Sequence, residues 1–374
     1  MIILVTHSPI VGSSVLEYLV KNTTEKEWSS FIVTSRSPFK TIVSDPRIKF
    51  VALDFTENVD RLVQQMKDVC AGVTHAYFCS YVHKDDFGEL NAANAALFEN
   101  FLDALEKVAN SLENVTLQTG GKYYYVHLMP VSSPAREDEP RKQGPVDNFY
   151  FDQEDKLAAS QQGKAWTWNV IRPEAIVGST SKPNGMNEAL TIAMYLLICR
   201  ELGTEAPMPT NQRYWEGTDD VSFGPLIADL TIYVSTNTHC ANEAFNIANG
   251  DHITWKYLWP RLAAYFDANA TSDQKFSKPV PKEGDVQLDT SFLEWSQDKR
   301  QVWDELCDRK GLPSAKATFD FGTWAFQDWV FGRSWSATLS ISKARHFGWT
   351  GYKDSYQCFI ETFDAFKNQG LIPH

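Results

Sequence analysis

The first 180 residues alternate short runs of β-branched and aromatic residues with segments whose apolar residues recur at helical spacing. The runs predict strands and the segments between them predict helices. Strands are expected at 2–5, 31–34, 48–53, 74–80, 115–118 and 167–171, and helices at 11–20, 59–69, 89–108 and 150–161. Because a helix between two strands forms a right-handed crossover, this order predicts an α/β fold with a doubly wound parallel sheet.

The pattern changes beyond residue 180. Helical segments at 187–202, 224–231 and 257–266 alternate with proline-rich and aromatic loops, and a short run near 243–247 indicates a strand that returns to the sheet edge. Eleven of the twelve tryptophans follow residue 160; they suit a lobe that lines an apolar pocket, although most are expected to fill a core. We therefore divide the chain into a Rossmann-like domain, residues 1–180, and a mainly helical C-terminal substrate cap, residues 181–374.

Charge and cysteine content exclude several classes of protein. The net charge of -12, with no block of Lys and Arg, argues against nucleic acid as a partner. No apolar run approaches the roughly 18 residues of a membrane helix, and the first five residues predict a strand rather than a signal peptide. The six cysteines are scattered, so free thiols in the cytoplasm are expected, and the spacing of His and Cys predicts no metal site.

A lysine and a tyrosine follow the fifth predicted strand. Lys122 ends the segment Leu117-Gln118-Thr119-Gly120-Gly121-Lys122, and Tyr150 opens the helix after the long, proline-rich loop 123–145. Open α/β folds bind ligands where their strands end. A lysine beside a tyrosine lowers the cost of a phenolate and lets the hydroxyl donate to a developing oxyanion. Either residue alone is usually structural, but the pair in this setting predicts an acid catalyst.

The turn after the first strand is where a dinucleotide-binding unit holds the pyrophosphate. It reads Thr6-His7-Ser8-Pro9-Ile10-Val11-Gly12. Only Gly12 occupies an expected glycine position, because Thr6 and Pro9 occupy the other two. Proline has no N–H to donate, so the N–H groups of Ile10 and Val11 remain as the expected phosphate donors.

Two further positions concern the nucleotide. The second strand ends at Ser35 and Arg36, where many such folds place an acid for the ribose 2′-hydroxyl. An arginine there favours a 2′-phosphate, and so NADPH over NADH, with a plain surface arginine as an equal alternative. Asp54 follows the third strand and either caps a loop or binds the adenine amino group.

Four motifs, in order, resemble those of the progesterone 5β-reductase/iridoid synthase-like (PRISE) family of atypical extended short-chain dehydrogenases, in its fungal form. They are Leu117-Gln118-Thr119-Gly120-Gly121-Lys122-Tyr123-Tyr124, Asn148-Phe149-Tyr150-Phe151-Asp152-Gln153-Glu154-Asp155, Arg172-Pro173-Glu174-Ala175-Ile176-Val177-Gly178 and the run from Phe245 to Lys256. The resemblance implies an NADPH-dependent 1,4-reduction of an enone or enal. Hydride reaches the β-carbon while Tyr150, supported by Lys122, hydrogen-bonds the carbonyl oxygen as it becomes an enolate.

The resemblance also implies a set of cofactor-binding residues for NADP(H). They are Thr6, Pro9, Ile10, Val11, Gly12, Ser35, Arg36, Asp54, Phe55, Ser80, Thr119, Gly120 and Ile176. The usual Tyr-x-x-x-Lys signature is absent, since Glu154 stands four residues after Tyr150, and this agrees with the family. Tyr125 stands where related sequences tend to be small, so its ring is expected to narrow the pocket.

The leading prediction is an NADPH-dependent ene-reductase that acts on a small apolar carbonyl substrate in secondary-metabolite biosynthesis. Because Thr6 and Pro9 replace family glycines, a cofactor-independent isomerase or cyclase that polarises a carbonyl with the Tyr/Lys pair is the alternative. A cofactor-binding regulatory protein without turnover is a third interpretation, which the catalytic pair disfavours. Fold alone does not decide among them, and a homodimer is left open.

Overall fold

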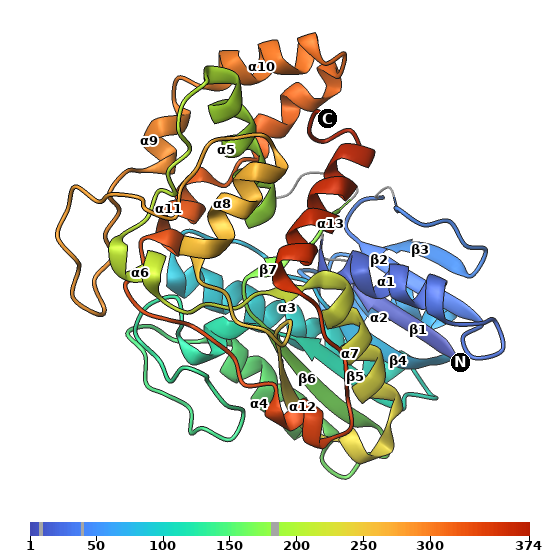
Figure 1. The fold of residues 1–374 in the computed structure, drawn as a ribbon. Coiled ribbons are helices and arrows are strands. Elements are labelled where there is room, and N and C mark those ends of the chain that lie inside the picture. The colour runs from blue at the N-terminus through green and yellow to red at the C-terminus, as the bar shows by residue number, and fades with distance from the viewer. Residues whose placement is uncertain (7–9, 39–40, 181–186) are drawn as a thin grey trace.

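Seven parallel strands form the central sheet in this computed structural model, which describes residues 1–6, 10–38, 41–180 and 187–374 (Figure 1). The strands are β1 (Ile2–Thr6), β2 (Ser30–Ser35), β3 (Ile48–Ala52), β4 (Val73–Phe78), β5 (Asn114–Gln118), β6 (Thr167–Pro173) and β9 (Glu243–Ile247). Their order is β3-β2-β1-β4-β5-β6-β9, and every neighbouring pair is parallel. The predicted Rossmann-like sheet is confirmed. Its strand order reverses between β1 and β4, which places a ligand crevice at their carboxyl ends.

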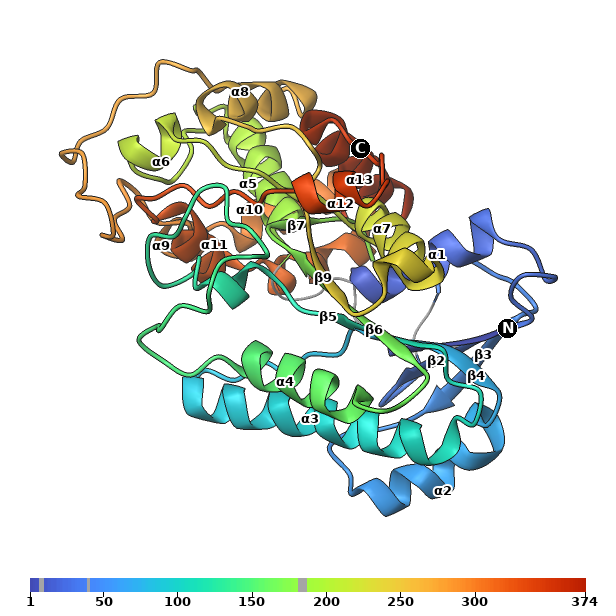
Figure 2. The same ribbon diagram turned by 90° about the horizontal axis from the view of Figure 1, so that it is seen from below.

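Helices cover both faces of the sheet (Figure 2). One face carries α1 (Val11–Asn22) and α7 (Gly224–Thr236), and the other carries α2 (Val59–Cys70), α3 (Phe87–Val108) and α4 (Phe149–Gln161). Alternate residues of β1 serve the two layers: Ile3 and Val5 pack with α1 and α7, and Leu4 packs with α2 and α3. Such double burial explains why the strands read as continuous apolar runs.

The second half of the chain contributes to both the cap and the sheet. The sequence placed 224–231 in the cap, but α7 packs on the sheet, because its apolar residues meet those of α1 and β1. The strand expected near 243–247 is β9, which pairs with β6. The remaining short elements are η1 (Gly121–Tyr124), β7 (Ile176–Val177), α6 (Gln212–Glu216), β8 (Ser222–Phe223), η2 (Thr238–Cys240) and α12 (Ser342–His346).

The cap is built around α5 (Glu188–Leu202), whose residues from Glu188 to Cys199 are all buried. A helix that is buried all round must be the centre of its layer. Around it pack α8 (Trp255–Tyr265), α9 (Phe292–Ser296), α10 (Arg300–Arg309), η3 (Pro313–Phe321), α11 (Trp324–Phe331) and α13 (Ser355–Asn368). Trp215, Trp255, Trp259 and Trp303 are fully buried, so these tryptophans fill the core.

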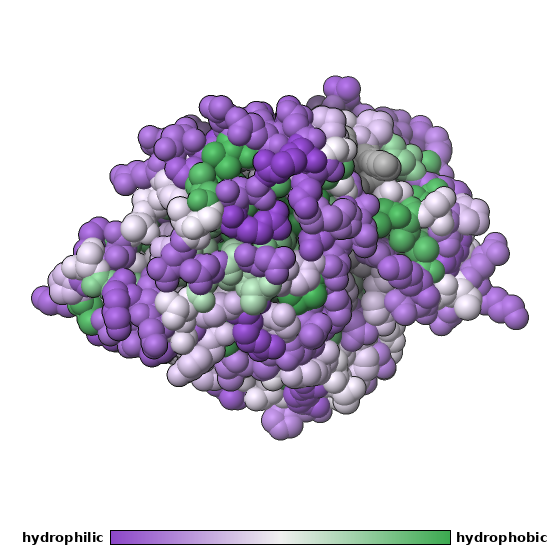
Figure 3. Space-filling model, turned by 45° about the horizontal axis from the view of Figure 1, so that its top comes forward, coloured by the Kyte–Doolittle hydropathy of each residue, from purple (hydrophilic) through white to green (hydrophobic). Residues whose placement is uncertain are grey.

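The surface is largely hydrophilic on the face that Figure 3 shows, with small separate apolar patches. All six cysteines are free and buried. Within the described part of the chain, no helix is both long and apolar enough to cross a membrane. Those residues also hold no group of three or more His, Cys, Asp or Glu side chains that could bind a metal ion.

Phe101→Ala should lower the free energy of unfolding by about 3–5 kcal/mol, because it leaves a cavity where α3 meets the sheet. Phe101 is fully buried between the rings of Phe55, Phe78 and Phe98. Phe87→Ala, in the same helix, is the control: Phe87 is 41% exposed, and the expected loss is under about 1 kcal/mol. Urea denaturation measures both. Equal losses would contradict the layer described for α3.

Candidate active site

A cavity of about 820 Å³ lies at the carboxyl ends of β1, β4, β5 and β6. The sheet side contributes Ile10, Val11, Cys79, Ser80, Gln118, Thr119, Gly120 and Ile176, and the cap contributes Trp324, Phe326, Trp329 and Val330. Lys122 and Tyr150 both line it, so the structure brings the predicted pair to one cavity. Apolar walls with a few converging polar groups are typical of a small-molecule site.

Tyr150 is set in place by the start of α4. The side chain of Asn148 caps this helix by accepting from the Tyr150 N–H at 3.2 Å. Its amide nitrogen donates to the carbonyl oxygens of Lys122 at 2.9 Å and Tyr123 at 3.3 Å. One side chain therefore joins the backbone that carries the tyrosine to the backbone that carries the lysine.

The Tyr150 hydroxyl approaches the backbone at Gly120. A Cβ atom at Gly120 would lie 3.6 Å from the Tyr150 hydroxyl oxygen and 3.2 Å from the carbonyl oxygen of Pro173. A methyl group would crowd the carbonyl, since this approach is closer than most Cβ contacts. Burial, with Tyr81 as a smaller cause, raises the pKa of Tyr150, so the hydroxyl stays protonated and able to donate.

Lys122 shares the cavity without pairing directly with Tyr150 among the described contacts. Its Nζ lies 5.8 Å from the centre of the Tyr81 ring, and burial lowers its pKa. The sequence predicted that the lysine would lower the cost of ionising the tyrosine. That effect of the lysine stays a prediction, because the rise in the pKa of Tyr150 has burial as its main cause and Tyr81 as a smaller one.

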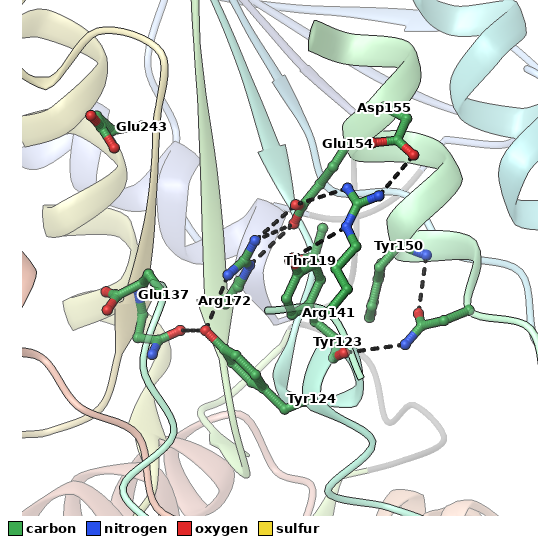
Figure 4. A network of polar contacts seen from close by, with 12 residues as sticks. Thr119, Tyr123, Tyr124, Glu137, Arg141, Tyr150, Glu154, Asp155, Arg172 and Glu243 are labelled. Carbon is green, nitrogen blue, oxygen red and sulfur yellow. Dashed lines mark hydrogen bonds and ion pairs between the residues drawn. The ribbon is translucent and has the colours of Figure 1, made fainter. Parts of the chain in front are cut away.

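Glu154 explains why α4 carries no Tyr-x-x-x-Lys signature. Its carboxylate forms a two-pronged ion pair with Arg172 at the end of β6, with Nη2–Oε2 and Nη2–Oε1 distances of 2.8 and 3.0 Å (Figure 4). The Arg172 guanidinium also lies 3.5 Å from the centre of the Tyr123 ring and donates to the Tyr124 hydroxyl at 3.1 Å. The position thus clamps α4 to the sheet.

The predicted cofactor residues fall into two groups. Ile10, Val11, Ser80, Thr119, Gly120 and Ile176 line the cavity. Thr6 does not: it is fully buried, and its hydroxyl accepts from the N–H groups of Cys79 at 2.8 Å and Ser80 at 3.1 Å. Thr6 therefore ties the end of β1 to the end of β4, a structural role for its side chain that the sequence did not predict. Pro9 lies outside the described residues, and Gly12 is buried in the first turn of α1.

The other predicted residues lie farther along the sheet edge. Ser35 ends β2, and Arg36 follows it with an exposed side chain. Asp54 caps a turn, because its carboxylate accepts from the N–H and hydroxyl of Thr56 at 3.0 and 2.7 Å; this is one of the two roles foreseen for it. The Phe55 side chain packs in the core against α3, and its carbonyl oxygen accepts from the Asn100 side chain at 3.0 Å.

Several cavity residues were missed by sequence reasoning. Glu174, Glu188 and Arg333 bring buried charge to one wall. His127 lines the cavity with a buried Nδ1 that has no hydrogen-bond partner in the described structure, and burial lowers its pKa to about 3.

Tyr125 was wrongly expected to narrow the pocket. Its ring packs over Gly144 and its hydroxyl donates to the Val146 carbonyl, away from the cavity.

These polar residues carried no motif that marks them. Glu174 sits within a quoted motif, but its neighbours in sequence do not show that its carboxyl is buried. Arg333 and Glu188 lie 145 positions apart, as their numbers show, and meet only through the cap. The aromatic content of the cap was the one available signal, and it is reflected in Trp324, Phe326 and Trp329 on the cavity wall.

Comparison with known proteins agrees with this geometry. Residues 16–373 match the family described as the PRISE-like Rossmann-fold domain. The chain belongs to the PRISE family. It is 66% identical over 362 residues to the short chain dehydrogenase gsfE of Penicillium aethiopicum, covering 97% of this chain and 96% of the relative. The resemblance that the motifs indicated is therefore confirmed.

More distant members of the PRISE family have names that describe an activity. The chain is 30% identical to an (S)-8-oxocitronellyl enol synthase of Nepeta cataria and 29% identical to the 3-oxo-Delta(4,5)-steroid 5-beta-reductase of Arabidopsis thaliana, with 97% of this chain and 91% of each relative covered. Among solved structures, the UDP-glucose 4-epimerase of Thermotoga maritima aligns with a TM-score of 0.66 at 15% identity, over 98% of this chain and 99% of that one. That likeness supports the fold alone.

Asn148→Ala should lower the free energy of unfolding by about 2–4 kcal/mol, because it removes a helix cap and two further hydrogen bonds. Asn58→Ala is the matched control. Asn58 caps α2 through the Arg61 N–H at 2.9 Å, so the expected loss there is about 1 kcal/mol. Chemical denaturation measures both. If the two losses were equal, Asn148 would act as a cap only and would not couple Lys122 to Tyr150.

Proposed function

We propose that this protein is an NADPH-dependent ene-reductase that reduces the C=C bond of a small α,β-unsaturated carbonyl compound in a secondary-metabolite pathway. The observation that carries the proposal is that the partly buried Tyr150 and Lys122 line one largely apolar cavity. Desolvation raises the pKa of Tyr150, which keeps its hydroxyl a donor. The name of one relative, a 3-oxo-Delta(4,5)-steroid 5-beta-reductase, supports it, because that name describes the reduction of an enone.

The residues at the cavity suit the nicotinamide end of a dinucleotide. Ile10 and Val11 line it where α1 begins. Helix starts of this kind hold phosphate. The Gln118 side-chain oxygen, which lines the same cavity, is buried without a hydrogen-bond partner in the described structure and can accept from an amide. Arg36 would meet the 2′-phosphate, and Ile176 and Thr119 would face the nicotinamide.

NADPH, when bound, supplies the hydride for the β-carbon. The chain contributes the electrophilic half of the reaction. Tyr150 donates a hydrogen bond to the carbonyl oxygen, which strengthens as negative charge moves onto that oxygen. The Lys122 ammonium adds a positive charge to the same cavity, and the apolar walls lower the local dielectric, so both interactions are stronger than in water. The hydroxyl keeps its proton throughout and hydrogen-bonds the enolate oxygen, and a proton taken from solvent water adds at the α-carbon to complete the reduction.

An isomerase or cyclase that works without NADPH is the second candidate. Thr6 supports it, since this residue replaces a family glycine and its side chain is committed to β4. The name of the enol synthase relatives also describes a product other than a simple reduced ketone. Both candidates need Tyr150 as a donor. They differ in nucleotide dependence, because the reductase consumes NADPH in step with product.

Tyr150→Phe should lower kcat roughly a hundred- to a thousandfold, with a smaller effect on substrate binding, because the hydroxyl acts mainly in the transition state. Lys122→Ala should lower kcat too, and the double variant should be little worse than the worse single one. The measurement is NADPH oxidation with a panel of enones, with product analysis in nucleotide-free buffer as a second assay.

Tyr18→Phe serves as the matched control. It also removes one tyrosine hydroxyl, which donates to Asp229 at 2.7 Å between α1 and α7, away from the cavity. Its activity should equal that of the unmodified protein. Full activity of Tyr150→Phe in both assays would overturn the site assignment, and product without NADPH consumption would favour the isomerase or cyclase.

Arg36→Ala should weaken NADPH binding by about 1.5–3 kcal/mol, the range for a charge-assisted contact, and should leave NADH binding almost unchanged. Titration of nucleotide fluorescence gives both dissociation constants. Arg61→Ala is the control, because Arg61 is an exposed arginine on α2 that pairs with Glu57, which precedes the helix. An equal loss for the two nucleotides would contradict the preference for NADPH.

A further inference from the structure

One wall of the cavity carries buried ionisable groups that the proposed reaction does not use. Glu174 follows β6, Glu188 opens α5, and Arg333 follows α11, and all three line the cavity. Their exposed fractions are 6%, 4% and 4%, so each is more than nine-tenths buried. Charged groups at such depth are normally paired or hydrogen-bonded.

The Glu174 carboxyl group has no such hydrogen bond among the described residues. Neither of its carboxyl oxygens has a hydrogen-bond partner within the described residues. Its charged neighbour Arg333 holds Nη1 3.6 Å from Oε1, beyond hydrogen-bond distance. The backbone of Glu174 is fixed, because its N–H donates to the Ser222 hydroxyl at 2.9 Å. The side chain is therefore held at the cavity wall, and its two carboxyl oxygens make no hydrogen bond to the described residues.

Gly121 makes room for this carboxyl. A Cβ atom at Gly121 would lie 3.1 Å from Oε2 and 3.2 Å from the carboxyl carbon of Glu174. The neighbouring Gly120 admits the Tyr150 hydroxyl in the same way. Two successive glycines thus allow two polar groups, one just after β6 and one in α4, to lie against one short stretch of backbone.

Arg333 is engaged elsewhere. It donates to the Val330 carbonyl at 3.1 Å and to the Tyr214 hydroxyl at 3.2 Å, and it lies 3.7 Å from Asp219. Its positive charge is therefore shared with another acid. Burial raises the pKa of Glu174 to about 8, with Arg333 opposing and Asp219 adding to the rise. This rise favours the neutral acid, which can donate one hydrogen bond.

We propose that Glu174 is a second polar contact for the substrate and binds a carbonyl, hydroxyl or ether oxygen separate from the carbonyl held by Tyr150. The inference rests on the proposed function. It defines the substrate class as an oxygenated enone with at least two oxygen-bearing groups. An unoxygenated enone of equal size leaves the buried carboxyl unpaired, and sites of this kind discriminate strongly against such analogues. A metal ion does not fit, because the Arg333 guanidinium faces the same carboxyl.

The test uses matched pairs of aryl enones that carry a methoxy group, in the para or meta position, or its ethyl isostere. In the unmodified protein, kcat/KM should favour the methoxy compound of at least one pair. Glu174→Leu should reduce that preference roughly ten- to a hundredfold, because leucine cannot hydrogen-bond the methoxy oxygen. Glu174→Gln keeps a donor and an acceptor and should retain the preference to within about threefold.

Two further variants separate a binding role from a structural one. Gly121→Ala leaves Glu174 in the chain but displaces its carboxyl, so the methoxy preference should fall as in Glu174→Leu. Glu137→Gln is the control, because Glu137 accepts from the Asn246 N–H at 2.8 Å and does not line the cavity. It should leave the preference unchanged. Thermal unfolding of each variant establishes that it is folded.

Binding without turnover keeps this inference distinct from the proposed function. Calorimetric titration of the saturated methoxy and ethyl ketones should show the same preference and its loss in Glu174→Leu, even if no enone is reduced. An equal preference in Glu174→Leu and the unmodified protein would overturn the inference. So would a weaker NADPH affinity in Glu174→Leu with an unchanged methoxy preference, because Glu174 would then serve the cofactor.

Discussion

The absence of two side chains, at Gly120 and Gly121, makes room for two polar groups of the cavity, the Tyr150 hydroxyl and the Glu174 carboxyl. These residues follow β5 where its neighbour β6 ends, so two elements converge on their backbone. A Cβ atom at Gly120 would crowd the Pro173 carbonyl beside the Tyr150 hydroxyl, and one at Gly121 would meet the Glu174 carboxyl. Neither glycine is needed for a left-handed backbone, since both φ values lie outside that region. Their role is steric, and the polar centre of the site depends on it.

The end of β1 departs from the glycine pattern of dinucleotide-binding folds in a way that preserves the sheet. A glycine at position 6 would leave the N–H groups after β4 without the acceptor that the Thr6 hydroxyl provides. Because those N–H groups belong to Cys79 and Ser80, which line the cavity, the threonine also fixes the cavity wall. Thr6 therefore lacks the open backbone that a glycine would give at the end of β1. In its place, the threonine hydroxyl joins the ends of β1 and β4 by two hydrogen bonds.

The layers of the fold could be predicted from sequence because both sheet faces are buried. Strand runs such as 2–5 are then apolar throughout, and the helices between them show clear periodicity. The helices after residue 290 were not predicted, although α13 shows the helical pattern and buries Phe359, Phe363 and Phe366 on one face. Likewise, the motifs identified Lys122 and Tyr150, whereas Glu174, Glu188 and Arg333 meet only through the tertiary packing of β6, α5 and α11.

Placing the lysine and the tyrosine on different elements has a structural cause. In α4, the position one turn after Tyr150 holds Glu154, which faces Arg172 at the end of β6 and clamps the helix to the sheet. A lysine there would meet the arginine as a like charge in a buried setting, which is strongly unfavourable. The cation therefore comes from the turn after β5. Its alignment with the tyrosine no longer follows from the geometry of one helix, and Asn148 supplies that alignment by bonding to both backbones.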